Sequence, residues 1–316
     1  MSRDIDIGQL LDARFEITAR VEHAGMATVF KALDCETGRT VVIKIPQADV
    51  FTNPTSCSRL AEEAAILAKL DHPGIVKSIP MAMKSRPYLV LTYVEGQMLH
   101  DILKRMGPPP VCWVLQLASR LCDILEYMHR HQVVHSDLKP CNIIISDDGR
   151  PHLIDFGIAK QLHWRPFTLE FLSPQPGTLE YMAPEQMDGR RVDTRADIYS
   201  LGLIMYEILA GRRPVQDGGR IRPLRELNSE VSEPVEEIVL HALAPNTSDR
   251  YRSAAAMKAE LDFPEMVQVT GKYHNPRKPN AWPKRLSLAG VVLGLAATPF
   301  ILFYVFFLMF QRQLAP

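Results

Sequence analysis

HSDLKPCN, residues 135–142, is framed by two short apolar runs, VV at 133–134 and III at 143–145. Because β-branched runs of this kind predict short strands, the polar residues between them are expected to form a loop. Asp137 and Asn142 place side-chain oxygens in this loop, and oxygens are the ligands that Mg²⁺ prefers. Asp and Asn are also common in turns, so the stretch taken alone leaves an ordinary turn open.

A further carboxylate follows the next short strand. The run HLI at 152–154 predicts that strand, and Asp155 comes directly after it, before the letters FG. Asp155 therefore stands at a strand end, like the two oxygen-bearing residues of the loop. The three residues together predict a cation site more specifically than any one of them does.

Lys44 interrupts an apolar strand, VVIKI at 41–45. A buried, unpaired ammonium is costly, so this lysine either points to solvent or meets an anion. A helix predicted over 59–70 offers that anion, because Glu63 lies on its apolar stripe whereas Glu62 is rotated off it. We expect Lys44 to pair with Glu63, although the strand by itself also allows a solvent-facing lysine.

The remaining pattern separates two lobes. Residues 14–46 carry β-branched residues with an ETG turn, which predicts a β-rich lobe. Two long helices are predicted over 111–131 and 195–210, the second ending at Gly211. The short strands lie where the two lobes meet, so the oxygen-bearing residues are expected there.

Composition restricts the class of protein. The chain has 36 Lys and Arg against 36 Asp and Glu, and this zero net charge argues against a nucleic-acid partner bound through overall charge. Apolar residues at 47% and charged residues at 23% are typical of a globular protein. The five cysteines are odd in number and form no C-x-x-C pair, which favours a reducing compartment over a disulfide framework or a structural zinc site.

The C-terminal segment differs from the rest. Residues 286–310 are 25 positions without a charged side chain. At ~1.5 Å per residue, a helix of this length crosses the ~30 Å hydrocarbon layer, so we predict a single transmembrane helix. Positive residues concentrate before it, in a basic, Pro-containing juxtamembrane linker at 264–285, and only Arg312 follows. This asymmetry predicts that residues 1–285 face the cytoplasm at the cell (inner) membrane and that a short tail, 311–316, lies outside.

Gly290 and Gly294 form a G-x-x-x-G pair within this span. Small residues four positions apart allow two membrane helices to approach closely, which favours a homodimer. Such pairs also occur by chance in membrane spans, so a monomer stays open.

Five motifs occur in one order along the chain. They are V-V-I-K (41–44), Glu63 on the following helix, H-S-D-L-K-P-C-N (135–142), D-F-G (155–157) and A-P-E (183–185). Over about 250 residues, the chain resembles the eukaryotic-type (Hanks-type) protein kinases found in bacteria. The resemblance implies an α+β, bilobal protein-kinase-like fold over 14–263, with a small β-rich N-lobe and a larger helical C-lobe. The transmembrane helix would follow it.

The resemblance also implies roles for the motif residues. Asp137 would orient the substrate hydroxyl and accept its proton, and Lys139 would neutralise charge on the transferring γ-phosphate. Lys44 would contact the α- and β-phosphates of ATP, held in place by Glu63.

ATP and Mg²⁺, or Mn²⁺ in its place, are the implied cofactors, with Asn142 and Asp155 as the metal ligands. The implied nucleotide contacts are Val21, Gly25, Val29, Lys44, Leu91, Tyr93, Val94, Asn142 and Asp155. Residues 91–94 would be the hinge that meets adenine. The resemblance further pairs Glu185 with Arg250, and it assigns Asp197 to hold the backbone of the 135–142 loop.

Two segments resemble the Ser/Thr branch of the family and not the tyrosine branch. They are the Lys139-Pro140 pair and G-T-L-E-Y-M-A-P-E at 177–185, in which Thr178 would line the substrate site. The implied partners are proteins that present Ser or Thr.

The phosphate-covering loop departs from the family pattern. The family writes G-x-G-x-x-G-x-V, whereas this chain has Glu22, Ala24 and Ala27 before Val29, with Gly25 at a neighbouring position. Alanine resists positive φ, and a Glu beside phosphates adds like charge. We therefore expect weaker ATP binding than in a glycine-rich relative.

Ser136 replaces the family arginine that clasps a phosphorylated activation loop. Without that cation, a phosphate on the loop loses its main charge partner. Thr168 and Ser173 lie in this loop. The sequence allows them to be phosphorylation sites or ordinary polar loop residues. We expect activity that does not require phosphorylation of the loop.

These residues predict a membrane-anchored kinase that transfers the γ-phosphate of ATP to Ser and Thr hydroxyls of proteins, its own included. Two alternatives stay open. A pseudokinase scaffold is favoured by the altered glycine loop and opposed by the intact motif residues. A kinase-like small-molecule phosphotransferase, such as the aminoglycoside type, shares H-x-D-x-x-x-x-N but lacks the G-T-x-x-Y-x-A-P-E segment that this chain carries.

Overall fold

The computed structural model describes residues 5–24, 27–46, 54–80, 87–156, 159–161, 178–214, 216–217 and 220–273. All of them belong to one compact unit, Met1–Pro276; the second unit, Arg277–Pro316, lies outside the described residues. Within the described ranges, no helix is long and apolar enough to cross a membrane. The predicted span 286–310, its Gly290 and Gly294, and the tail 311–316 are not among those residues.

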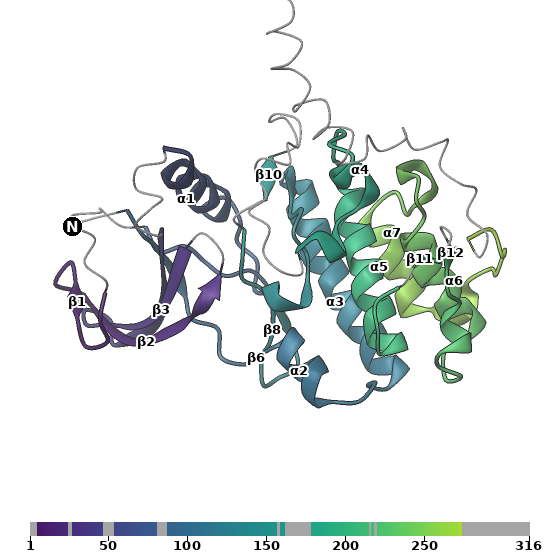
Figure 1. The fold of residues 1–316 in the computed structure, drawn as a ribbon, viewed down its shortest axis with the longest axis horizontal. Helices are drawn as coiled ribbons and strands as arrows, with labels where there is room; N and C mark the ends of the chain where they lie inside the picture. The colour runs from purple at the N-terminus through teal and green to yellow at the C-terminus, as the bar shows by residue number, and fades with distance from the viewer. Residues whose placement is uncertain are drawn as a thin grey trace, which may run out of the picture. The chain divides into compact units, whose positions relative to one another are not determined.

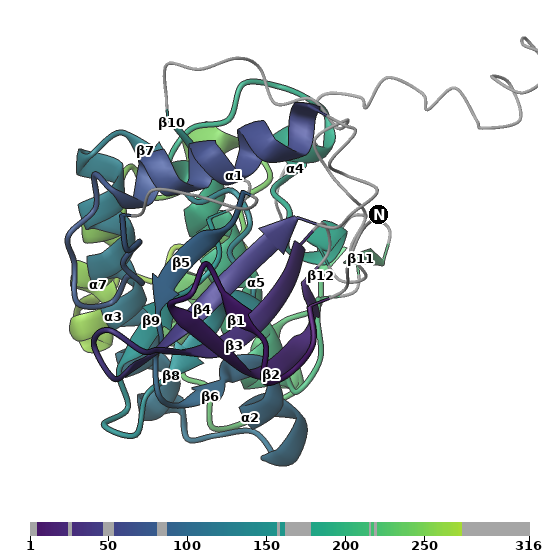
Figure 2. The ribbon, with the colours of Figure 1, turned by 90° about the vertical axis from the view of Figure 1, so that its left-hand side faces the viewer.

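The N-terminal lobe is built on a five-stranded antiparallel sheet in the order β1-β2-β3-β4-β5 (Figure 1). The strands are β1 (Leu10–Leu11), β2 (Phe15–Ala24), β3 (Ala27–Asp34), β4 (Arg39–Pro46) and β5 (Leu89–Thr92). Gly38 has a φ of 68°, a left-handed conformation that glycine adopts without steric cost, and it closes the turn between β3 and β4. Helix α1 (Pro54–Leu67) lies beside the sheet and contacts β4 (Figure 2).

The two faces of this sheet carry different residues. Residues opposite one another on paired strands share a face, and the register places Val21, Val29, Lys44 and Leu89 in one row. Alternate residues turn to the other face, where they form a separate apolar cluster: Phe15, Ile17, Phe30, Ala32, Val41, Ile43, Ile45 and Val90. Lys44 therefore stands on the face of the sheet that does not carry this cluster.

The C-terminal lobe is mainly helical. Its helices are α2 (Leu99–Arg105), α3 (Val111–Arg130), α4 (Pro184–Met187), α5 (Arg195–Ala210), α6 (Glu233–Ala242) and α7 (Ala254–Asp262). Short strands are β6 (Gln97–Met98), β7 (Val133–Val134), β8 (Ile143–Ile145), β9 (Pro151–Leu153), β10 (Lys160–Gln161), β11 (Gln216–Asp217) and β12 (Arg220–Ile221). Helices α3 and α5 lie side by side, with α7 against α3 and α6 against α5 (Figure 1).

Helix α5 forms the centre of this lobe. It is apolar on all sides and nearly every residue is buried, as expected for a helix surrounded by others. A Cβ at Gly202 would come within 2.9 Å of Ala242 Cβ, so glycine permits the close approach of α6. The helix ends at Gly211, whose φ of 68° provides the left-handed C-terminal residue that the sequence predicts.

The predicted bilobal α+β architecture is confirmed, with differences in detail. Helix α5 has the predicted bounds and α3 ends one residue early, whereas α1 starts five residues before the predicted 59 and ends at Leu67. The strands that were not predicted are β1, β5, β6, β10, β11 and β12. β5 consists of LVLT, a short apolar run that sequence periodicity alone cannot distinguish from other buried segments.

Candidate active site

Lys44 is the centre of a charged cluster beneath the sheet. Its Nζ lies 2.6 Å from Glu63 Oε1 and 3.0 Å from Asp155 Oδ1. The same Glu63 oxygen accepts a hydrogen bond from the Phe156 backbone N–H at 3.2 Å. Glu63 therefore connects α1 to β4 and to the segment that follows β9.

Burial and charge act in opposite directions on Lys44. Burial alone would lower its pKa, but the carboxylates of Asp155 and Glu63 outweigh this and raise the pKa above its ordinary value. Lys44 and Glu63 are 7% and 4% exposed, whereas neighbouring Glu62 is exposed. As predicted, Glu63 and not Glu62 forms the ion pair with Lys44, because Glu63 lies on the buried face of α1.

The second cluster lies in the loop between β7 and β8. Lys139 Nζ donates to Asp137 Oδ2 at 2.9 Å. The Asn142 side-chain nitrogen donates to the Asp137 carbonyl at 2.8 Å and to Asp137 Oδ2 at 3.1 Å. Burial raises the pKa of the Asp137 carboxyl, and the charge of Lys139 partly offsets this effect.

A buried carboxylate holds the backbone of this loop. Asp197, at the start of α5, accepts hydrogen bonds from the His135 N–H at 2.9 Å and the Ser136 N–H at 2.8 Å. His129 Nε2 lies 2.9 Å from the same carboxylate. The contact of Asp197 with the loop backbone is the one that the family resemblance implies, whereas His129 was not foreseen because nothing in its position at the end of α3 marks it.

The two clusters meet where β8 and β9 pair. Ile143 is the partner of Leu153, and the Ile154 N–H donates to the Asn142 carbonyl at 3.2 Å. Asn142 and Asp155 therefore stand at neighbouring strand ends. Because Asp155 also contacts Lys44, residues from β4, from α1, from the 135–142 loop and from the segment after β9 gather in one region.

The donor set fits a Mg²⁺ ion that binds together with phosphate. Among the residues that the structure describes, no group of three or more His, Cys, Asp or Glu could hold a metal ion by itself. Asn142 uses its side-chain nitrogen on Asp137, which leaves the amide oxygen to accept a ligand. One carboxylate, one amide oxygen and water match Mg²⁺, which is commonly held by few protein oxygens and by substrate phosphates.

Of the predicted nucleotide contacts, Val21, Val29 and Lys44 lie in one row of the sheet, whereas Leu91, Tyr93 and Val94 lie in and directly after β5. Val29 is the strand partner of both Val21 and Lys44. Leu91 is buried inside β5, where it pairs with Val42. It therefore belongs to the strand and not to the hinge, and only its side chain can contact a nucleotide. Tyr93 and Val94 follow the strand, as a hinge requires. Gly25 lies outside the described residues.

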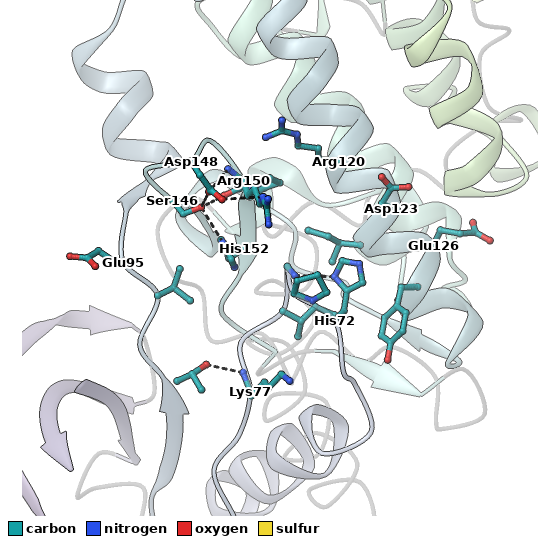
Figure 3. A pocket seen from close by; sticks show the side chains of 18 of the residues that line it. His72, Lys77, Glu95, Arg120, Asp123, Glu126, Ser146, Asp148, Arg150 and His152 are labelled. Atoms are coloured by element: carbon teal, nitrogen blue, oxygen red, sulfur yellow. Dashed lines mark hydrogen bonds and ion pairs between the residues drawn. The ribbon is translucent and has the colours of Figure 1, made fainter. Parts of the chain in front are cut away.

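A separate groove of about 1360 Å³ is lined by the segment after α1, the end of β5, α3 and the β8–β9 turn (Figure 3). Tyr93 and Val94 are among its lining residues, whereas Lys44, Asp137 and Asp155 are not. Several of its charged side chains pair with one another, such as Arg150 with Asp148 at 3.0 Å and Lys258 with Asp123 at 3.2 Å. This groove is therefore distinct from the site of the two charged clusters.

Two further contacts join α4 to the rest of the lobe, one at Arg250 and one at the 135–142 loop. Arg250 donates to both oxygens of Glu185 at 2.7 Å, the pairing that the resemblance implies. Gln186 is fully buried and donates to the Ser136 carbonyl at 2.8 Å. Sequence reasoning missed Gln186, because a polar residue after A-P-E gives no sign of pointing inward. Thr168, Ser173 and Gly157 lie outside the described residues.

Comparison with known proteins agrees with this geometry. A family model described as "Protein kinase domain" matches residues 18–261. "Serine/threonine-protein kinase PknB" of Mycolicibacterium smegmatis is 33% identical over 307 residues, covering 92% of this chain and 48% of that protein. The protein of the same name from Mycobacterium tuberculosis strain H37Rv is 32% identical over 293 residues, covering 88% of this chain and 45% of that protein. The chain thus spans about half the length of the curated relatives it matches.

A solved structure is similar in fold. The crystal structure of the Mycobacterium tuberculosis PknI kinase domain superposes with a TM-score of 0.65 at 22% identity, covering 83% of this chain and all of that one. At this identity the likeness concerns the fold alone. The family match spans most of the chain and contains both charged clusters, and it confirms the predicted enzyme class. The chain belongs to the protein kinase family and carries its transferase domain over residues 18–261.

Proposed function

We propose that this protein is a serine/threonine protein kinase that transfers the γ-phosphate of ATP to Ser and Thr hydroxyls of proteins, itself included. The observation that carries the proposal is the contact of Lys44 with both Glu63 and Asp155, next to a loop in which Asp137, Lys139 and Asn142 are bonded to one another. Phosphoryl transfer needs positioning and charge neutralisation more than covalent chemistry, and this arrangement supplies both.

Each residue has a separate task in the proposed reaction. Lys44, kept cationic by its two carboxylate partners, binds the α- and β-phosphates, and Glu63 fixes its position. Asp137 accepts a hydrogen bond from the substrate hydroxyl and takes its proton. Lys139 lies 2.9 Å from that carboxylate and neutralises charge on the γ-phosphate.

Asp155 and Asn142 are the proposed metal ligands. Bound Mg²⁺ neutralises charge on the phosphates and fixes their orientation. Mn²⁺ prefers the same oxygen ligands, so it is expected to support the reaction as well. The protein's own contribution is the rigid placement of the two oxygens at the ends of β8 and β9.

Specificity for Ser and Thr is supported by the sequence branch and by the relatives. Lys139-Pro140 and the segment 177–185 resemble the Ser/Thr branch, and the PknB proteins at 32–33% identity carry Ser/Thr kinase names. Thr178 begins the turn Thr178–Tyr181, whose Tyr181 hydroxyl donates to Glu207 on α5. The proposed protein substrate binds beside this turn.

The decisive experiment is phosphoryl transfer by the purified full chain in detergent. It is incubated with labelled ATP, Mg²⁺ and either a generic protein substrate or an aminoglycoside, the labelled amino acids are identified after hydrolysis, and nucleotide binding is measured on the same preparation. We expect phosphoserine and phosphothreonine. Label on phosphotyrosine would contradict the specificity, label on aminoglycosides alone would establish the small-molecule enzyme, and nucleotide binding without transfer would establish the pseudokinase.

We also propose that residues 286–310 anchor the protein as a single membrane span. The uncharged length and the basic residues before it support this orientation, with the kinase domain cytoplasmic and the C-terminus outside. The protein should stay in membranes after an alkaline wash, and only the tail should be accessible from outside. A homodimer through Gly290 and Gly294 is tested by crosslinking the wild type and the Gly290→Leu, Gly294→Leu double variant, and equal crosslinking would exclude it.

The altered phosphate loop gives a prediction on ATP affinity. Glu22→Gly is expected to lower the KM for ATP roughly fivefold, because it removes a like charge near the triphosphate worth about 1 kcal/mol and restores a glycine. Steady-state kinetics measure the change. Glu22→Gln is the matched control that removes the charge and keeps the backbone. An unchanged KM in both variants would show that Glu22 points away from the nucleotide.

Activity is predicted not to depend on phosphorylation of the activation loop. Because Ser136 offers no cation, the Thr168→Ala, Ser173→Ala double variant should keep its kcat within about twofold of wild type. The assay uses the intact protein after phosphatase treatment, with phosphatase-treated wild type as the control. Loss of activity in the double variant would refute the prediction.

A further inference from the structure

Gln186 connects two parts of the active region through one side-chain amide. It lies in α4 and is fully buried. Its Nε2 donates to the Ser136 carbonyl at 2.8 Å, and its Oε1 accepts from the Ala183 N–H at 3.0 Å. Since a carbonyl can only accept and an N–H can only donate, the orientation of the amide is fixed by its partners.

The residue that Gln186 reaches is the immediate neighbour of the proposed base. Ser136 has a φ of 64°, a left-handed conformation that is costly for a residue with a Cβ and persists only where surrounding contacts hold it. Asp197 holds the N–H of Ser136 and Gln186 holds its carbonyl. The peptide group that leads into Asp137 is therefore held by Gln186 at its carbonyl and by His135 Nδ1, 3.3 Å away, at its N–H.

Residue 136 is a serine and not the family arginine, so it has no positive charge with which to bind the activation loop. Within the described part of the chain, the buried Ser136 hydroxyl has no hydrogen-bond partner. The Gln186 amide joins the loop to the 183–186 segment, which follows the turn Thr178–Tyr181 beside which we place the substrate. This connection is neutral and requires no phosphate.

We propose that Gln186 is a positioning residue, which holds the Ser136 carbonyl and thereby keeps the Asp137 carboxylate aligned with the substrate-binding segment without loop phosphorylation. The inference rests on the proposed kinase function for its kinetic consequence. The competing explanation is that Gln186 only caps α4, since a Gln or Glu three residues into a helix commonly accepts the N–H of the capping residue.

One substitution separates these two explanations. Gln186→Glu keeps the shape and can still accept from the Ala183 N–H, so it preserves the cap. An ionised Glu cannot donate to the Ser136 carbonyl, but a protonated one can. Gln186→Leu loses both bonds at every pH.

The kinetic test compares the variants with wild type at several pH values. At pH 8, we expect Gln186→Glu to lower kcat on the order of tenfold with the KM for ATP unchanged, because a buried carbonyl loses its donor. The variant-to-wild-type ratio should rise as pH falls, because protonation restores the donor, while the ratio for Gln186→Leu stays flat. The charged groups facing this site are Glu185, paired with Arg250, and Asp197, beside His129. These groups also stand in wild type and in Gln186→Leu, so a flat ratio for Gln186→Leu shows that the pH dependence of the Gln186→Glu ratio comes from the introduced carboxyl.

A second readout does not depend on catalysis. Hydrogen exchange of the 134–141 backbone should accelerate in Gln186→Leu and, at pH 8, in Gln186→Glu, while α7 exchanges as in wild type. The matched control is Gln116→Glu, the same change on the exposed face of α3, which should alter neither readout. Unchanged exchange of the loop in both Gln186 variants would overturn the proposal even if the protein were inactive. A Gln186→Leu enzyme with full kcat, which lacks the bond at every pH, would also overturn it, whereas an inactive wild type would refute the proposed function instead.

Discussion

Asp137→Asn is expected to lower kcat by about a hundredfold to ten-thousandfold while leaving ATP binding and thermal stability close to wild type. The asparagine keeps the shape of the side chain and an oxygen for Lys139, which donates to Asp137 Oδ2 at 2.9 Å. It cannot take the proton of the substrate hydroxyl. Burial raises the pKa of Asp137, which makes this carboxylate a stronger base than an exposed one and enlarges the expected loss.

The measurement combines steady-state phosphorylation, nucleotide binding by calorimetry and thermal unfolding on the same preparation. The matched control is Asp147→Asn, the same change in an exposed turn between β8 and β9, which should keep full activity. A variant at position 137 that retains more than a tenth of the wild-type rate would refute the role of general base. A variant that loses ATP binding as well would place Asp137 in nucleotide binding rather than in proton transfer.

The hydrophobic periodicity of the sequence was sufficient to predict much of the fold and the Lys44–Glu63 ion pair. The inward stripe of α1 distinguished Glu63 from Glu62, because residues three and four apart share a helix face and only one of the two lies on that face. The same rule identified α3 and α5 almost to their ends. The order of the motifs then connected Lys44, Asp137 and Asp155, which are far apart in the chain and whose proximity no local pattern could establish.

The contacts of Gln186 and His129 and the strand β5, which the sequence did not predict, all depend on tertiary packing. Gln186 and His129 are polar residues whose functional contacts are made to backbone or carboxylate groups more than forty positions away. No period or composition distinguishes them from surface residues of the same type. β5 was missed for a related reason, since its three apolar residues and Thr92 become a strand only because β4 is available as a partner.

The largest expected effect on stability comes from Arg250. All five of its N–H groups have acceptors: Nη1 and Nη2 each donate to one oxygen of Glu185 at 2.7 Å, Nε donates to Ala244, and Nη1 and Nη2 also reach the carbonyls of Arg195 and Pro245. Both charged side chains are almost completely buried. Glu185→Ala is therefore expected to destabilise the protein by about 3–5 kcal/mol, because it leaves a buried guanidinium without its counter-charge.

For a domain of this size, such a loss corresponds to a decrease of about 10 °C in Tm, measurable by thermal unfolding of the full chain in detergent. The double variant Glu185→Leu, Arg250→Met is expected to be more stable than Glu185→Ala alone, because no charge remains buried. It should not regain wild-type stability, since the carbonyls of Ala244, Arg195 and Pro245 lose their donor. Arg250→Lys tests the geometry separately, because a lysine cannot form the two parallel bonds to Glu185. A Tm within about 2 °C of wild type for Glu185→Ala would show that the ion pair does not hold α4 to the C-terminal lobe.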